Sequence, residues 1–161
     1  MTGSRLRRHI GSKIRNENLG YADQDDTLNR LFAAADRVRM HAHAPYSRFF
    51  VGAALLTSDG KVHTGCNVEN SAYPLGICAE ASAIAAMIAN QGRMTIDALC
   101  VVGGPQGQDS GVVMPCGGCR QRIFEFATPQ TRLYVRDKKG QQQGFDFGTL
   151  LPHAFDDTDL P

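Results

Sequence analysis

Apolar residues recur at helical spacing near the start of the chain. They follow an Asp/Thr cap at positions 26–27 and are Leu28, Leu31, Phe32, Ala35 and Val38. A repeat of three or four residues places them on one face of a helix. The pattern therefore predicts a helix over residues 26–40, which ends before Pro45.

A hairpin is predicted next. Residues 49–57 and 61–68 are rich in β-forming side chains, and Ser58-Asp59-Gly60 separates them. An Asp-Gly pair favours the tight turn that joins antiparallel strands. Residues 77–91 are Ala-rich, contain neither Gly nor Pro, and end at Gly92, so a largely buried helix should follow the hairpin.

In the second half of the chain, predicted strands alternate with predicted helices. A continuous apolar run and a shorter alternating one predict strands at 96–102 and 131–136, with helices at 116–126 and 148–151. Strands that alternate with helices after a hairpin indicate a mixed sheet with helices packed on its faces. Gln141-Gln142-Gln143 is the one low-complexity patch and is expected to be a solvated loop.

Composition indicates one folded domain. The chain has 161 residues, 42% hydrophobic and 20% charged, and its formal net charge of +1 lacks the cationic surplus of nucleic-acid binders. No apolar stretch approaches the ~20 residues that cross a membrane, and no signal-peptide core follows the basic start, so a cytoplasmic protein is expected. We expect a basic, disordered tail at 1–24 and the domain at 25–161.

The cysteines supply candidate chemistry. Cys116-Gly117-Gly118-Cys119 begins one predicted helix, and Cys78-Ala79-Glu80 begins another. The C-x-x-C spacing lets two sulfurs bind one metal or form one redox disulfide. Both uses need a low thiol pKa, which a helix N-terminus favours. Because the two helix ends follow neighbouring strands, they can face one point.

Three protein ligands on zinc leave an open position, which is the catalytic arrangement, whereas four thiolates make a structural site. Cys100 lies in an apolar run and is expected to be a buried, inert thiol. Cys66 remains a less favoured fourth ligand. Glu80 beside Cys78 suits proton transfer, although stabilising the helix dipole is an alternative role.

Two segments together resemble the zinc signature of the cytidine deaminases, in the form where Cys replaces His as the first ligand: Cys78-Ala79-Glu80 and Pro115-Cys116-Gly117-Gly118-Cys119-Arg120-Gln121. Residues 45–53, 65–70 and 150–155 also resemble that family, so the likeness covers about residues 28–155. It implies an α/β fold in which a mixed five-stranded sheet (opening hairpin, then βαβαβ) is sandwiched by helices.

The resemblance implies zinc-dependent hydrolytic deamination of cytidine or 2'-deoxycytidine to the uracil nucleoside plus ammonia, as in pyrimidine salvage. One Zn²⁺ per subunit would be bound by Cys78, Cys116 and Cys119 and would activate a water that attacks C4 of the base. Glu80 would carry the proton to N3 and then to the departing ammonia. No organic cofactor is implied.

The same resemblance implies substrate contacts and a homotetramer with shared active sites. Phe49 would pack against the base, while Asn67 and Glu69, two residues apart on one strand face, would bind the ribose hydroxyls. The remaining contacts would come from the backbone of Ala79, the carbonyl of Met114, and Phe155 packed on a neighbour's base. The partner implied is a small nucleoside, with no nucleic acid and no membrane.

Two positions depart from the family. Met114 replaces a small hydroxyl residue, and Ala81 replaces an Arg. Three thiolates around Zn²⁺ leave one net negative charge and Glu80 adds a second, which helix N-termini offset only in part. Arg120 or another basic side chain could supply the rest; otherwise the zinc-bound water should be less acidic than in relatives that carry the Arg.

Three rival functions remain open on these residues. The nearest is deamination of a modified cytosine nucleoside, such as a nucleoside antibiotic. A polynucleotide deaminase would use the same zinc chemistry on flipped bases but would need a basic groove. A zinc-stabilised binding module would need a closed metal site and would release no ammonia.

Overall fold

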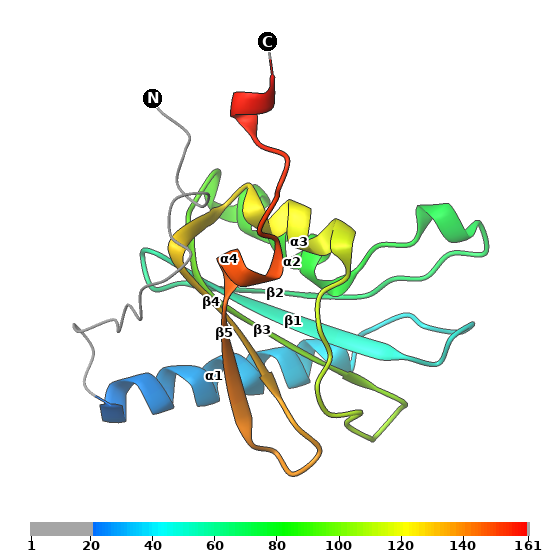
Figure 1. Ribbon diagram of the computed structural model, residues 1–161. Helices are drawn as coiled ribbons and strands as arrows, with labels where there is room; N and C mark the ends of the chain where they lie inside the picture. The colour runs from blue at the N-terminus through cyan, green and yellow to red at the C-terminus, as the bar shows by residue number, and fades with distance from the viewer. Residues whose placement is uncertain (1–20, 161) are drawn as a thin grey trace.

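The computed structural model describes residues 21–160, which form one sheet covered by helices on both faces (Figure 1). Helix α1 lies on one face, and α2 and α3 lie on the other. The elements in chain order are α1 (Tyr21–Arg39), β1 (Phe50–Thr57), β2 (Val62–Cys66), η1 (Tyr73–Leu75), α2 (Ala79–Gln91), β3 (Ile96–Gly104), α3 (Gly117–Phe124), β4 (Ala127–Arg136), β5 (Gln142–Asp146), α4 (Phe147–Leu150) and η2 (Asp157–Asp159).

The sheet has the strand order β2-β1-β3-β4-β5. Strand β1 pairs antiparallel with both β2 and β3, whereas β3 and β4 are parallel and β5 returns antiparallel to β4. Helix α3 makes the crossover between the parallel strands. The expected mixed five-stranded sheet is confirmed. No helix within residues 21–160 combines the length and apolarity needed to cross a membrane.

Two elements begin well before the residue that the sequence predicts, and one segment predicted to be a loop is a strand. Helix α1 begins at Tyr21 rather than at 26, and β4 begins at Ala127 rather than at 131. The solvated loop expected for the glutamine patch is wrong at positions 142 and 143, which belong to β5. These glutamines join the sheet through the backbone, opposite Arg136 and Val135 of β4, while their side chains stay exposed. The tail expected at 1–24 stays a prediction, because residues 1–20 lie outside the described part.

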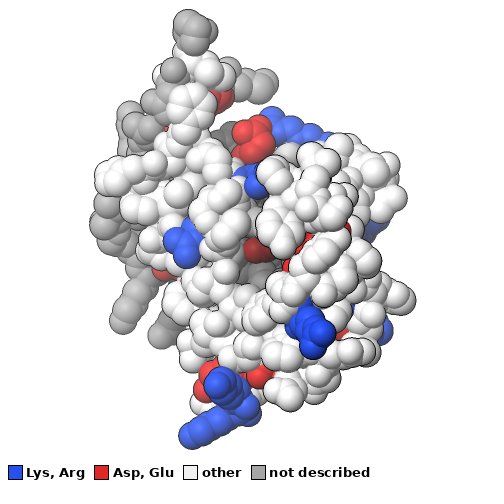
Figure 2. All heavy atoms as spheres, turned by 90° about the vertical axis from the view of Figure 1, so that its right-hand side faces the viewer, with Lys and Arg blue, Asp and Glu red and all other residues white. Residues whose placement is uncertain are grey.

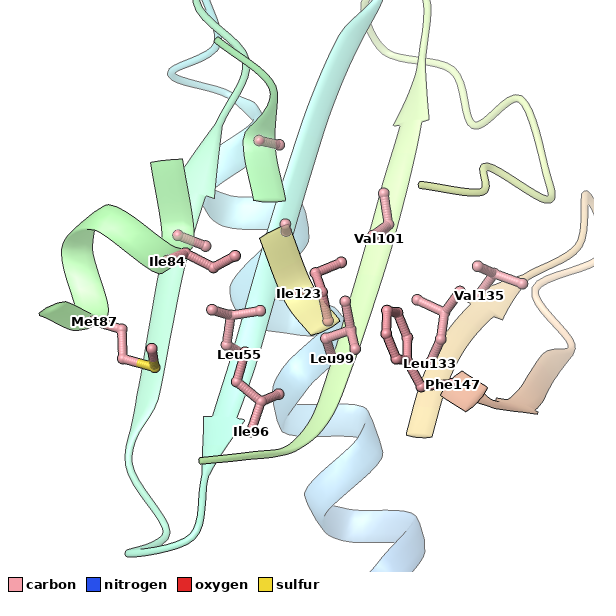
Figure 3. Close-up of a cluster of buried hydrophobic side chains, with 13 residues drawn as sticks. Leu55, Ile84, Met87, Ile96, Leu99, Val101, Ile123, Leu133, Val135 and Phe147 are labelled. Carbon is pink, nitrogen blue, oxygen red and sulfur yellow. The ribbon is translucent and has the colours of Figure 1, made fainter. Parts of the chain in front are cut away.

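The core lies in two layers, one on each face of the sheet. The layer under α2 and α3 is the larger (Figure 3). Its fully buried side chains include Leu55, Met87, Ile96, Leu99, Val101, Ile123, Leu133, Val135 and Phe147. The layer under α1 contains Leu31, Phe32, Ala35, Ala54, Cys100 and Val102. Strand β3 contributes alternate residues to the two layers, as a strand buried on both faces must.

Glycine lets α1 approach the sheet closely. A β-carbon on Gly52 of β1 would lie 2.1 Å from the carbonyl oxygen of Ala35 and 2.9 Å from the β-carbon of Arg39. No side chain fits into that space. Gly52 therefore faces α1, and this orientation fixes which strand residues face each helix layer.

The segment between β3 and α3, residues 105–116, is fastened on the α1 side. Arg39 donates from Nη2 to the carbonyls of Pro105, at 2.9 Å, and of Gln108. Arg136 donates from Nε to Asp109 at 2.6 Å and pairs through both Nη atoms with the carboxylate of Asp36. These bonds join β4, α1 and the segment into one unit that leads to Cys116.

Candidate active site

Three cysteine sulfurs meet where α2 and α3 begin. Cys78 is the N-cap of α2, Cys116 is the N-cap of α3, and Cys119 lies in the first turn of α3. Their Sγ atoms all lie within 4.8 Å of one another. A tetrahedral zinc with Zn–S bonds of about 2.3 Å needs its sulfurs about 3.8 Å apart. The structure thus brings together the three expected ligands in a geometry that fits zinc.

The acidity of these thiols differs with their surroundings. Burial raises the pKa of Cys78 and of Cys119, and the negative charge of Glu80 raises that of Cys119 further. At Cys116 the backbone N–H of Cys119 lowers the pKa. Three thiolates this close repel one another, and a divalent cation among them relieves the repulsion. The donor set suits Zn²⁺ with a fourth position left open.

Glu80 lies at the floor of the site. It is 5% exposed, in the first turn of α2, and its carboxylate interacts with the Cys119 thiol. Burial raises the pKa of this carboxyl group. Figure 2 views the molecule from this end and shows a hollow with an acidic side chain at its bottom. A buried carboxyl group that can hold a proton is thus placed beside the metal ligands.

Cys66 and Cys100 stand apart from this cluster. Cys66 is paired with Gly52 across the hairpin, and cross-strand partners share a face of the sheet. Because Gly52 faces α1, the Cys66 sulfur lies on the face opposite the three-sulfur cluster, and its role as a fourth ligand is excluded. Cys100 is fully buried in the α1 layer, and burial raises its pKa to about 12. Its burial is as expected, and its lack of reactivity stays a prediction.

Asn67 and Glu69 lie beyond β2, which ends at Cys66, so the expectation that they share one strand face is wrong. Both brace the chain around the start of β1. The Asn67 side chain accepts a hydrogen bond from the Val51 N–H at 2.8 Å and donates to the Phe49 carbonyl at 2.9 Å. The Glu69 carboxylate accepts hydrogen bonds from the backbone N–H groups of Tyr46, at 2.9 Å, and Ser47, at 3.2 Å, and from the Ser47 hydroxyl. Sequence reasoning did not anticipate these internal bonds.

The apolar residues expected in the pocket lie around the same end of the sheet. The Phe49 ring packs over Gly103 of β3, where it lies 3.1 Å from the position of an added β-carbon, with Val113 beside it. Met114 packs against the larger core layer, and Ala79 is fully buried at the start of α2. The backbone at the start of α2 therefore lies beside the three-sulfur cluster, and the Phe49 ring lies over the end of β3.

Phe155 is held at the surface near α3. Its side chain is among the exposed large hydrophobic groups, 59% exposed, while its carbonyl accepts a 2.7 Å hydrogen bond from Nε2 of Gln121. Sequence reasoning selected Phe155 but missed Gln121, which follows the C-x-x-C by only two residues.

Arg120 does not face the sulfurs. Its Nε donates to the Pro115 carbonyl at 2.9 Å and its Nη1 to the Leu150 carbonyl at 3.1 Å, so it fastens the start of α3 to α4. Two of its donors are thus committed to these carbonyls, and among the described residues Arg120 forms no hydrogen bond with a cluster sulfur. Compensation of the metal-site charge by Arg120 stays a prediction. Arg122 extends along α3 towards the turn that holds two of the cysteines: its Nη1 is 3.2 Å from where a β-carbon on Gly118 would be. Because residues four apart lie on the same face of a helix, the sequence could have indicated that the Arg122 side chain lies beside Gly118.

Comparisons with known proteins agree with this geometry. The family model described as the cytidine and deoxycytidylate deaminase zinc-binding region matches residues 25–135. A cytidine deaminase from Sporosarcina psychrophila is 41% identical over 133 residues, which are 83% of this chain and 94% of that protein.

Solved structures match over similar lengths. The crystal structure of cytidine deaminase from Burkholderia pseudomallei has a TM-score of 0.70 and 42% identity, covering 79% of this chain and 98% of that one. The cytidine deaminase from Mycobacterium tuberculosis has a TM-score of 0.67 and 40% identity, covering 80% of this chain and 97% of that one. The sulfur cluster, the buried glutamate and the fold thus occur in a chain that belongs to the cytidine and deoxycytidylate deaminase family.

Proposed function

We propose that this chain catalyses zinc-dependent hydrolytic deamination of cytidine and 2'-deoxycytidine, releasing uridine or 2'-deoxyuridine and ammonia. The observation that carries the proposal is the buried carboxyl group of Glu80 beside three convergent cysteine sulfurs. The relatives named cytidine deaminases support the same substrate, since they match most of the chain at about 40% identity.

Cys78, Cys116 and Cys119 would hold the zinc, one ion per subunit. Zinc supplies Lewis-acid activation of the attacking water when it is bound. Glu80 would receive one proton of that water at a carboxylate oxygen and deliver it to N3 of the cytosine ring. It would then take the second proton from the hydroxyl group now on C4 and pass it to the amino group, which leaves as ammonia while the C4 carbonyl forms. A single carboxyl group serves both steps because each transfer returns it to the state that the next one needs. Burial assists, since it raises the pKa of Glu80 and so stabilises the protonated form.

The nucleoside would be bound by the residues around the hollow. Phe49 packs against the base, Asn67 and Glu69 bind ribose hydroxyls, and the backbone of Ala79 and the carbonyl of Met114 bind the base edge. The support is positional, because Asn67 and Glu69 fix the segment that carries Phe49. Ribose would then add its hydroxyls to groups that are already held rigidly, which lowers the entropy cost of binding.

The active assembly is a homotetramer whose subunits share their active sites. Phe155 supports this, because a large exposed aromatic group tethered by Gln121 is suited to pack against a neighbour's substrate. Light scattering should give the mass of a tetramer, and a stable, active monomer would contradict the shared site.

The reaction would serve pyrimidine salvage in the cytoplasm. The formal net charge of +1 gives no reason to expect a polynucleotide substrate.

Ammonia release across a panel of substrates tests the proposal. The zinc-loaded protein would be assayed with cytidine, 2'-deoxycytidine, free cytosine, a ring-modified cytosine nucleoside and a single-stranded oligonucleotide. We expect the two natural nucleosides to give the highest kcat/KM. Preference for the modified nucleoside or for the oligonucleotide would replace the proposed substrate, and no ammonia from any of them would indicate a binding module.

A further inference from the structure

The three-cysteine centre carries an excess of negative charge that the described residues do not neutralise through direct hydrogen bonds. Zn²⁺ with three thiolates has one net negative charge, and the buried Glu80 carboxylate adds another beside it. Within residues 21–160, no Lys or Arg side chain donates a recorded hydrogen bond to any of the three sulfurs. Arg120 is turned towards carbonyls instead. The charge must therefore be balanced from a short distance away.

One guanidinium group occupies a suitable place. Arg122 follows Cys119 by three residues on α3, and its side chain folds back towards the start of the helix. Its Nη1 comes within 3.2 Å of the site of a β-carbon on Gly118, the residue between the two α3 cysteines. Gly118 thus leaves open the space that the guanidinium uses, directly beside the turn that presents Cys116 and Cys119.

The backbone of Arg122 lies in the last turn of α3, where the helix dipole favours a cation, while its side chain extends back to Gly118 in the first turn. Arg122 is exposed, and among the described residues it makes no recorded hydrogen bond or ion pair that would hold it in that position. The anionic group with which it interacts electrostatically is the carboxylate of Glu80.

We propose that Arg122 is a positioning residue that supplies the compensating positive charge of the zinc centre and so raises its affinity for zinc. The inference rests on the proposed zinc centre of the deaminase. Zinc binding converts three thiols into a cluster that is more negative by one unit, and a nearby guanidinium stabilises the product of that change. Because Arg122 is exposed, its contribution should be moderate and sensitive to salt.

The test compares zinc retention by the holoenzyme at low ionic strength as a chromophoric chelator is added. Arg122→Gln should lose half of its zinc at a chelator concentration roughly three- to tenfold lower than the unaltered protein does. Arg30→Gln is the matched control, because Arg30 is also exposed on a helix but lies on α1, across the sheet from the site. Arg122→Lys keeps the charge and should recover most of the lost affinity.

Salt separates a charge effect from a packing effect. At ~1 M salt the Debye length falls to about 3 Å, so the difference between Arg122→Gln and the unaltered protein should shrink to less than half. Equal zinc retention at low salt would overturn the proposal. So would a loss that Arg122→Lys does not recover or that salt leaves unchanged. Ammonia release is measured separately, so a protein that follows this charge pattern without deaminating cytidine would contradict only the proposed function.

Discussion

Gly65 of β2 packs directly against the backbone of α2: a β-carbon at this position would lie 2.2 Å from the nitrogen of Ala83 and 2.6 Å from the carbonyl oxygen of Ala79. Backbone atoms in a packed layer cannot move aside as a flexible side chain can. The contact therefore sets how closely the first turn of α2, with Cys78 and Glu80, approaches the sheet.

Gly65→Ala should be strongly destabilising and should disturb the zinc centre. Overpacking against backbone is expected to lower the free energy of unfolding by about 3 kcal/mol or more. Gly60→Ala is the control, because Gly60 lies in the hairpin turn at φ +81° with open space around it and should cost only about 1 kcal/mol of backbone strain. In both variants, urea denaturation measures the free energy of unfolding, and the zinc content of the purified protein shows whether the zinc centre is disturbed. Equal losses in the two variants would contradict the close approach.

Glu80→Gln should keep stoichiometric zinc and lose turnover. The amide has the shape of the carboxyl group but cannot relay the proton, so kcat should fall by at least roughly a hundredfold. Glu125→Gln is the matched control, since Glu125 is exposed beyond the last turn of α3 and lies 3.7 Å from Arg93. Near-normal activity of Glu80→Gln would remove this residue from the mechanism.

Removal of the Glu69 side chain should affect nucleosides more than free bases. In Glu69→Ala, kcat/KM for cytidine should fall by roughly thirtyfold or more through lost bonds to ribose, and that for cytosine much less. Ser47→Ala is the control, because it leaves the carboxylate of Glu69 and removes only the bonds that the Ser47 hydroxyl makes to Glu69 and to the Phe49 N–H. An equal loss on cytidine and cytosine would mean that Glu69 acts only by bracing residues 46 and 47.

The pH dependence of cytidine binding provides a related check. The Ser47 hydroxyl, followed by the backbone N–H groups of Tyr46 and Ser47, holds the pKa of Glu69 below its usual range. A lowered carboxyl pKa keeps the charged form down to lower pH. The KM for cytidine should therefore begin to rise only as the pH falls through that lowered pKa, and Ser47→Ala should move the rise to higher pH.

The sequence predicts the three sulfurs and Glu80 because their signals are local: two cysteines at C-x-x-C spacing and a Cys-Ala-Glu at a helix start. It does not predict β5, because Gln142 and Gln143 lack the alternation that marks a half-buried strand. The internal bonds of Asn67 escape sequence reasoning for another reason. Its partners Phe49 and Val51 lie around the start of β1, and only the folded hairpin brings Asn67, just beyond β2, next to them.

In the zinc-free protein, the rate at which each cysteine is alkylated should follow the exposure and the pKa of its thiol. Alkylation follows the thiolate, so Cys116, exposed and with a lowered pKa, should react first and level off at a lower pH than an ordinary thiol. Cys119 should be the slowest of the three cluster cysteines, because burial raises its pKa.

Cys100 serves as the internal reference. With a pKa of about 12 it is ionised in roughly one molecule in ten thousand at about pH 8, so it should be labelled only after unfolding. Peptide mass spectrometry after timed iodoacetamide treatment measures each site, and full labelling in denaturant shows that all five thiols are available. Early labelling of Cys100 would contradict its burial.

The fastening of residues 105–116 limits how the site can open. Arg39 and Arg136 hold this segment from the α1 side, so it should act as a fixed wall through many catalytic cycles. Residues 70–77 are exposed throughout, with Tyr73 and Leu75 projecting from η1. Elements with few buried contacts open at the lowest cost in free energy. Uridine is therefore expected to leave past residues 70–77, and the rate of that motion would set an upper limit on turnover.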